Sequence, residues 1–120
     1  MFVKRLSECQ EFTANDGCRI RELLHPVDDA LDLPYSIAIA GVQPGERTYR
    51  HKLKQVEVYF ILAGYGRMLI DSEPRNVSAG DTIYIPAESI QSIENTGEDE
   101  LQFMAIVSPP WRQEDDIRLE

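Results

Sequence analysis

The chain has 120 residues, of which 42% are hydrophobic, so it is long enough for one ordinary domain with its own core. The formal net charge of −9 argues against binding to nucleic acid or anionic membranes, because a phosphate-binding protein needs a basic face. No segment approaches the roughly 20 apolar residues of a membrane span, and the first residues lack a secretory signal. The sequence predicts a cytoplasmic protein whose partners are small molecules or other proteins.

Short segments rich in β-branched and aromatic residues follow one another along the chain and predict strands. Between most of them lie clusters of Gly, Pro, Asn, Asp and Ser, a spacing typical of an antiparallel sandwich or barrel. Segment 25–34 is too short and proline-flanked to form more than a turn, and the charged segment 109–120 is expected on the surface. One all-β domain over residues 1–120 is expected, with strands at 18–24, 36–42, 56–62, 67–71, 82–85, 90–95 and 101–107.

The predicted strand over residues 56–62 is apolar on both faces. Its even positions are all apolar, and its odd positions combine Glu57 with Tyr59 and Ile61. A strand of this kind is covered on both sides, by the barrel interior on one and by a second sheet or subunit on the other. The pattern favours a homodimer, although cover of one face by the chain's own tail explains it equally well.

The stretch HKLKQVE, residues 51–57, places a histidine and a glutamate at positions of equal parity. If the chain is extended there, His51, Leu53 and Glu57 point to the same face. The histidine and the glutamate could share a metal ion, but the leucine between them cannot ligate one.

The flanking residues show a resemblance to a known family. GERTYRHKLKQVEVYFILAG (45–64) resembles the first cupin motif: glycine, five residues, His-x-His, three or four residues, glutamate, six residues, glycine. GDTIYIPAESIQSIEN (80–95) resembles the second motif, with Gly80, Pro86 and Asn95 at the family's spacing. Together with the fifteen residues between them, the motifs make a specific match over most of residues 40–107. The resemblance implies an antiparallel β-barrel of jelly-roll type.

The departures from the motifs concern the metal ligands. Cupins usually hold a divalent metal through three histidines and a glutamate, and the resemblance assigns His51 and Glu57 to two of these positions. Leu53 stands where the second histidine belongs and Gln91 where the third belongs, while Glu88 replaces the second glycine of the second motif. The Gln91 amide oxygen suits hard cations, so His51, Glu57 and Gln91 form a reduced set for a divalent metal of unidentified kind.

The same inward face predicts a ligand pocket. Alternation places Tyr59 beside the candidate ligands, with Gln91 on a neighbouring strand and Phe103 closing an apolar side. Arg47 and Tyr49, just before His51, are expected at the mouth, where they would meet an anionic ligand or be solvated. A plain barrel core with satisfied polar groups is a third interpretation of the same residues.

Two functions remain open. One is an enzyme that uses a weakly held divalent metal, as cupin dioxygenases, isomerases and decarboxylases do. The other is a metal-free module that binds a small metabolite or sugar without catalysis. The fold alone does not separate these hypotheses, and the sequence identifies no ligand.

Overall fold

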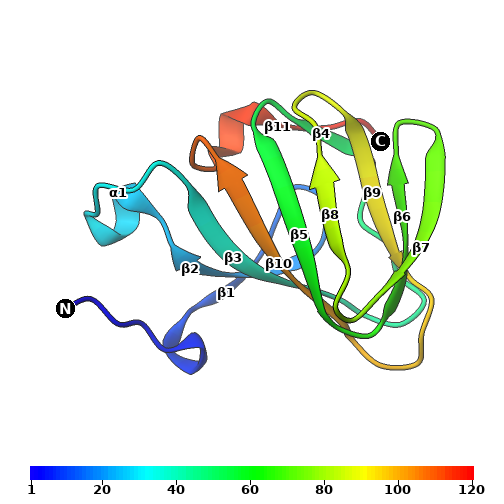
Figure 1. The fold of residues 1–120 in the computed structure, drawn as a ribbon, viewed down its shortest axis with the longest axis horizontal. Coiled ribbons are helices and arrows are strands. Elements are labelled where there is room, and N and C mark those ends of the chain that lie inside the picture. Colours follow the sequence, from blue (N-terminus) through cyan, green and yellow to red (C-terminus); the bar gives the residue numbers. More distant parts are fainter.

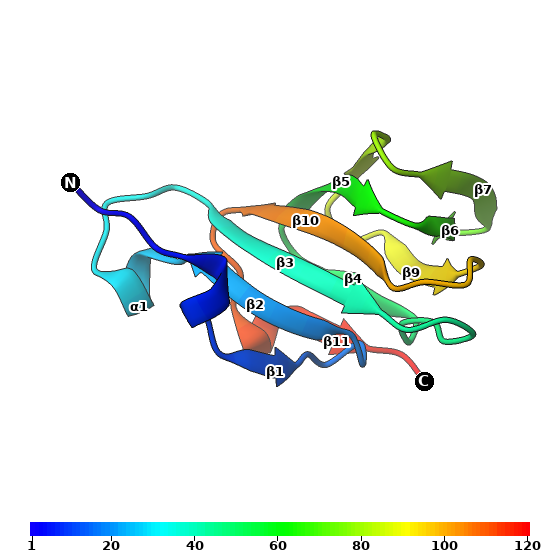
Figure 2. The ribbon, with the colours of Figure 1, turned by 90° about the horizontal axis from the view of Figure 1, so that it is seen from below.

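The computed structural model describes all 120 residues as two antiparallel sheets that face each other (Figures 1 and 2). Sheet A has the strand order β1 (Glu11–Thr13), β2 (Arg19–Leu24), β3 (Ser36–Val42), β10 (Leu101–Ser108), β5 (Val56–Ala63) and β8 (Thr82–Ile85). Sheet B has the order β11 (Asp116–Arg118), β4 (His51–Leu53), β9 (Ile90–Asn95), β6 (Tyr65–Ile70) and β7 (Glu73–Ser78). Helical structure is limited to α1 (Pro26–Asp29) and two 3-10 turns, Leu6–Glu8 and Gln113–Asp115. The predicted all-β jelly roll is confirmed.

Each predicted strand has a counterpart whose bounds differ by at most two residues, and four further strands complete the sheets. β1, β4 and β11 have only three residues each, too few to produce a recognisable alternation. β7 has the sequence EPRNVS, and its proline and polar residues are tolerated because it forms the outer edge of sheet B. Short or polar strands of this kind depend on their neighbours for stability and leave little signal in the sequence.

The core lies between the sheets and is built by alternation in β5 and β10. In β5 the residues Glu57, Tyr59 and Ile61 are buried, whereas Phe60 and Leu62 are exposed on the outer face. β10 pairs with β5 along its length and alternates in the same way, with a register shift between Gln102 and Phe103. The inward residues of both strands therefore meet inside the barrel, so the odd positions of the strand over 56–62 form its core face.

Segment 109–120 does more than lie on the surface. Residues Asp116–Arg118 form β11, which pairs with β4 in the register Asp116 to Leu53 and Arg118 to His51. The side chain of Trp111 is partly buried, and its backbone N–H donates to the Ser36 hydroxyl at 2.9 Å. The end of the described chain is therefore part of the barrel wall (Figure 1).

The motif glycines lie in turns with positive φ. Gly64, between β5 and β6, has φ +93°, and a Cβ there would come within 3.0 Å of the Glu100 carbonyl oxygen and of Leu101 Cα. Gly80, before β8, has φ +95° with open space around it. Glu88 occupies the position of a motif glycine and adopts φ +69°, a conformation that disfavours side chains with a Cβ.

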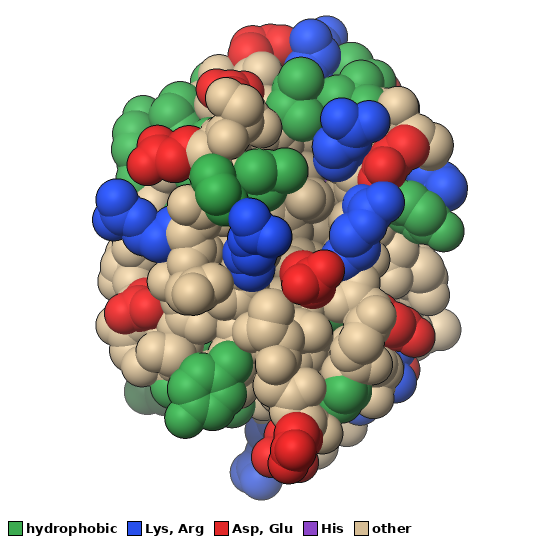
Figure 3. Space-filling model, turned by 90° about the vertical axis from the view of Figure 1, so that its right-hand side faces the viewer, with side chains coloured by type: hydrophobic (Ala, Val, Ile, Leu, Met, Phe, Trp, Pro, Cys, Tyr) green, Lys and Arg blue, Asp and Glu red, His purple; other side chains and the backbone are tan.

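Charge is mixed on the side of the molecule that carries β6 and β7. Lys and Arg side chains there lie among Asp and Glu side chains and scattered hydrophobic ones (Figure 3). In the groove formed by Arg47, Arg50 and Arg67, for instance, Glu94 and Glu120 lie among the three arginines. None of the helices is long and apolar enough to span a membrane.

Candidate functional site

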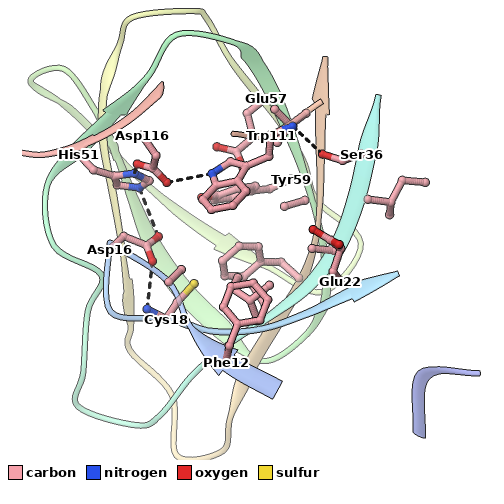
Figure 4. Close-up of a pocket in the computed structure, with 18 residues that line it drawn as sticks. Phe12, Asp16, Cys18, Glu22, Ser36, His51, Glu57, Tyr59, Trp111 and Asp116 are labelled. Carbon is pink, nitrogen blue, oxygen red and sulfur yellow. Dashed lines mark hydrogen bonds and ion pairs between the residues drawn. The ribbon is translucent and has the colours of Figure 1, made fainter. Parts of the chain in front are cut away.

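The His51 imidazole lies between two carboxylates. β4 holds it inside the barrel, and its Nδ1 is 2.8 Å from Asp116 Oδ1 on β11. Its Nε2 is 3.3 Å from Asp16 Oδ2, in the β1–β2 loop, within ion-pair distance but not aligned for a hydrogen bond. Both contacts are drawn in Figure 4. The ring is therefore oriented by Asp116, while its other nitrogen faces Asp16.

This arrangement favours the imidazolium form. Burial alone lowers the pKa of His51, but the hydrogen bond with Asp116 and the negative charges of Asp16, Asp116 and Glu57 outweigh it. The net result is a pKa of His51 above the ordinary value of 6.5. In the protonated form, which this arrangement favours, His51 carries a positive charge in a site otherwise rich in carboxyl groups.

A second group of hydrogen-bonded side chains links sheet A to sheet B. The Tyr59 hydroxyl donates to Gln91 Oε1 at 3.0 Å, and Gln91 Nε2 donates to Glu57 Oε1 at 3.0 Å. All three side chains are buried, and the Tyr59 ring also packs against the Phe103 ring with 4.2 Å between their centroids. The Gln91 amide therefore has both ends engaged within the protein.

Burial controls the ionisation of Glu57 and Tyr59. It raises the pKa of Glu57 from 4.5 to about 7, although the hydrogen bond from Gln91 and the charge of His51 act in the opposite direction. Burial, reinforced by the charge of Glu57, also raises the pKa of Tyr59 well above its ordinary value. Tyr59 is therefore a neutral hydrogen-bond donor at physiological pH, and Glu57 takes up a proton readily.

Glu57 and Tyr59 line a cavity of about 60 Å³ at the end of the barrel where Trp111 lies (Figure 4). Twelve of its 18 lining residues are hydrophobic, and four of these are the aromatic residues Phe12, Tyr59, Phe103 and Trp111. One water needs about 10 to 15 Å³ by this measure, so the space holds roughly four to six small atoms or groups. A mostly apolar cavity with a few convergent polar groups is the usual form of a small-molecule site.

Several residues of this wall were not identified from the sequence. Asp16, Asp116 and Trp111 all border the cavity, and the Trp111 indole N–H donates to Asp116 Oδ2 at 3.1 Å. Asp16 is fixed by its own turn, since its Oδ1 accepts from the Cys18 N–H at 3.0 Å. Asp16 comes from the β1–β2 loop, Trp111 from the irregular segment after β10 and Asp116 from a three-residue strand, and no periodicity connects them.

Cys18 and Glu22 lie on the β2 side of the wall. Burial, together with the charge of Asp16, raises the pKa of the Cys18 thiol well above its usual range, so this free thiol is a weak nucleophile. Burial and a hydrogen bond with Asp28 raise the pKa of Glu22 from 4.5 to about 7.

Two residues expected at the pocket mouth lie elsewhere. Arg47 binds Glu120 through both of its terminal nitrogens, at 2.6 Å and 3.0 Å, on the outer side of sheet B. The Tyr49 ring is covered by the Arg118 guanidinium, whose carbon lies 3.5 Å from the ring centroid. Neither Arg47 nor Tyr49 lines the cavity, and both are exposed.

The side chains at the four metal-ligand positions do not make a complete cupin centre. Leu53 is 2% exposed and offers no donor, and it does not line the cavity. Gln91 directs its amide oxygen at the Tyr59 hydroxyl, so only His51 and Glu57 remain as ligands of the usual kind. The residues present therefore do not fit a four-ligand metal centre.

A different group of potential ligands lies at α1. Ligand atoms of Glu22, His25 and Asp28 come within 4.8 Å of one another. Both ring nitrogens of His25 are already engaged, Nε2 with the Trp111 carbonyl oxygen at 2.8 Å and Nδ1 with the Val27 N–H at 3.2 Å. In this conformation His25 anchors Trp111 and has no free lone pair for a metal.

Comparison with known proteins gives the same family as the motifs. An uncharacterized protein of Methanocaldococcus jannaschii is 41% identical over 110 residues, which are 91% of this chain and 87% of that protein. An oxalate-binding protein of Thermotoga maritima is 34% identical over 65 residues, or 53% of this chain and 54% of that protein. The crystal structure of a predicted oxalate decarboxylase from Thermotoga maritima superposes with a TM-score of 0.78 at 27% identity, covering 90% of this chain and 99% of that one. Residues 38–107 match the cupin domain model, and the chain belongs to the cupin family.

Proposed function

We propose that this protein is a cupin that binds a small organic molecule in the barrel without a metal. The observation that carries the proposal is the cavity between Tyr59, Phe103 and Trp111. Glu57 and His51 also line this cavity. The aromatic rings offer contact to an apolar ligand body, and the polar groups offer hydrogen bonds that orient it.

The internal hydrogen bonds support a binding site that is formed before the ligand arrives. Glu57 and Tyr59 are held by Gln91, and His51 is held by Asp116, so these side chains lose little freedom on binding. Among the relatives, the Thermotoga maritima oxalate-binding protein is named for binding a small molecule. That likeness supports the class of function for this chain and not the identity of the ligand.

Filling the cavity tests the proposal. Ala105 lines the cavity on β10, so Ala105→Leu would occupy part of the space, whereas Ala79→Leu adds the same atoms at an exposed loop position. A library of small metabolites is screened by thermal shift, and each hit is then titrated against the fluorescence of Trp111, the only tryptophan. Hits should bind wild type and Ala79→Leu alike and bind Ala105→Leu at least ten-fold more weakly. The proposal is wrong if no compound binds, or if every hit binds Ala105→Leu as well as wild type.

A second candidate function is a metal-assisted one through the reduced set His51, Glu57 and Gln91. It is favoured by one observation: Nε2 of His51 is buried without a hydrogen-bond partner. An ion there would require Gln91 to release the Tyr59 hydroxyl and turn its oxygen toward Glu57. Metal analysis of protein purified without added metal or chelator tests this candidate, with His51→Ala as control. A stoichiometric divalent ion that is lost in His51→Ala would favour it over the metal-free proposal.

We also propose that the outer face of sheet A forms a homodimer interface. Phe60 is 39% exposed, Leu62 41% and Tyr84 61%, and they lie on the neighbouring strands β5 and β8. Exposed apolar side chains that gather on one sheet face mark an interaction site where they exceed a few hundred Å², and association of two copies would bury them.

A further inference from the structure

The cavity carries an excess of acidic groups. Its lining includes the carboxyl residues Asp16, Glu22, Glu57 and Asp116. No lysine or arginine lines it, and His51 is its only basic residue. A carboxylate ligand would enter next to four carboxyl groups with a single imidazole as its cationic partner.

His51 is also poorly placed to receive an anion. Its Nδ1 is bound to Asp116, and its Nε2 makes no hydrogen bond but lies 3.3 Å from Asp16 Oδ2, so an anion at either nitrogen would lie against a carboxylate of the protein. Glu57, in contrast, accepts only the bond from Gln91 through Oε1, and its Oε2 makes no hydrogen bond within the protein. The group left over for a ligand is thus a carboxylate oxygen, which binds a donor or a cation.

Aromatic rings line this mostly apolar cavity, in which the few carboxyl groups converge. Trp111 and Phe12 lie on opposite sides of the cavity in Figure 4, with the Tyr59 ring behind them. The face of an aromatic ring carries negative electrostatic potential, and rings around a small space recognise alkylammonium groups through cation–π contacts. Rings and carboxyl groups therefore favour the same sign of charge.

We propose that the ligand of this pocket is a small organic cation, an alkylammonium group with an apolar body of about four or five non-hydrogen atoms. The ammonium group contacts Glu57 Oε2 and the aromatic faces, and the alkyl part fills the apolar side. This inference rests on the proposed function, since it names the ligand class of the same pocket. It also separates this chain from its oxalate-binding relative, because oxalate is a dianion.

An isosteric pair of probes isolates the charge. tert-Butylammonium and tert-butanol have the same shape and number of non-hydrogen atoms, and oxalate serves as the anionic probe. Each is titrated at pH 8, above the Glu57 pKa of about 7, and at constant ionic strength, with the fluorescence of Trp111 reporting occupancy at the pocket wall. tert-Butylammonium should bind at least ten-fold more tightly than tert-butanol, and oxalate should not bind.

Three variants assign the preference to residues. Glu57→Gln keeps the shape of the side chain. It should lower the affinity for tert-butylammonium at least ten-fold and leave the affinity for tert-butanol within two-fold of wild type. Phe12→Leu removes one ring. It should lower the affinity for tert-butylammonium several-fold and leave the affinity for tert-butanol nearly unchanged. Glu98→Gln, at an exposed position between β9 and β10, removes an equal charge outside the pocket and should change neither affinity.

The outcomes separate the two proposals. If tert-butanol or oxalate quenches Trp111 as strongly as the cation does, the pocket binds small molecules but the inferred ligand class is wrong. If the cation binds and Glu98→Gln weakens it as much as Glu57→Gln does, the preference arises from net charge and the inference is also wrong. If no probe and no library compound binds, the inferred ligand class and the proposed function are both wrong.

Discussion

Replacing Glu57 by glutamine should stabilise the protein, and the gain should grow with pH. Glu57 is buried with a pKa raised from 4.5 to about 7, so between these values the folded state keeps a proton that the unfolded chain releases. The folded state therefore loses stability as the pH rises from about 5 to about 7, and more slowly above that. Glutamine cannot ionise, and its amide oxygen can still accept the hydrogen bond from Gln91 Nε2.

The size of the gain follows from the shift in pKa. One pH unit of difference between the folded and unfolded pKa corresponds to about 1.4 kcal/mol. With the two values of Glu57, the unfavourable contribution is about 1 kcal/mol at pH 5 and about 3 kcal/mol at pH 8. Glu57→Gln should therefore raise the free energy of unfolding by about 2 kcal/mol more at pH 8 than at pH 5.

Urea unfolding at pH 5, 6, 7 and 8 measures this difference, with the slope of the free energy against urea checked for constancy. Protein treated with chelator is used for both variants. The control is Glu98→Gln, whose free energy of unfolding should follow that of wild type within about 0.5 kcal/mol at each pH because position 98 is exposed.

A destabilised Glu57→Gln at pH 8, or a gain that does not change with pH, would refute the reasoning. The comparison also bears on the metal question. A divalent ion at Glu57 would keep the carboxylate ionised, and glutamine would then destabilise protein that had not been treated with chelator.

The remaining predictions concern the lost ligands, the dimer and the motif glycines. Leu53→His combined with Gln91→His should rebuild a four-ligand site and raise the affinity for nickel or zinc, measured by calorimetry; a folded double variant that binds no better than wild type would contradict it. Wild type should sediment as a dimer at tens of micromolar, as expected for an interface of about 1,600 Å², and Phe60→Glu should sediment as a monomer. Gly80→Ala should destabilise by about 1 kcal/mol through its positive φ alone, whereas Gly64→Ala adds a backbone clash and should lower the free energy of unfolding by about 2 to 4 kcal/mol. Equal losses for the two alanine variants in urea would show that the clash at Gly64 relaxes.

The fold was predictable because its signals are local and repeated. Alternation in the long strands and turn residues between them gave the all-β class, and the spacing of Gly80, Pro86 and Asn95 gave the family. Alternation also predicts that Glu57 and Tyr59 share the inward face of β5, as they do in the structure. These features depend on residues two apart or on motifs of about twenty residues, which a single sequence displays.

Much of the site could not be predicted, because it is assembled from distant and irregular segments. Asp16 lies in a loop and Asp116 on a three-residue strand, and no pattern links them to His51. The internal bonding of Gln91 was equally hidden, since the spacing of the motif shows a position but not the direction of an amide. The role of Trp111 depends on the pairing of β11 with β4, which only the folded chain reveals.

Segments from the early and the late part of the sequence form one wall of the pocket, and this has a consequence for synthesis on the ribosome. Asn15 donates to the Asp116 carbonyl oxygen across a sequence separation of 101 residues, and the imidazole between Asp16 and Asp116 depends on the same closure. During translation, residues appear at about 5 to 20 per second, so Asp16 leaves the ribosome several seconds before its counterpart. Until then, His51 lacks its orienting carboxylate and Trp111 is absent from the pocket. β10, which joins β3 to β5 in sheet A, is synthesised only shortly before Asp116, so sheet A and the binding site are both completed only when these late residues have emerged.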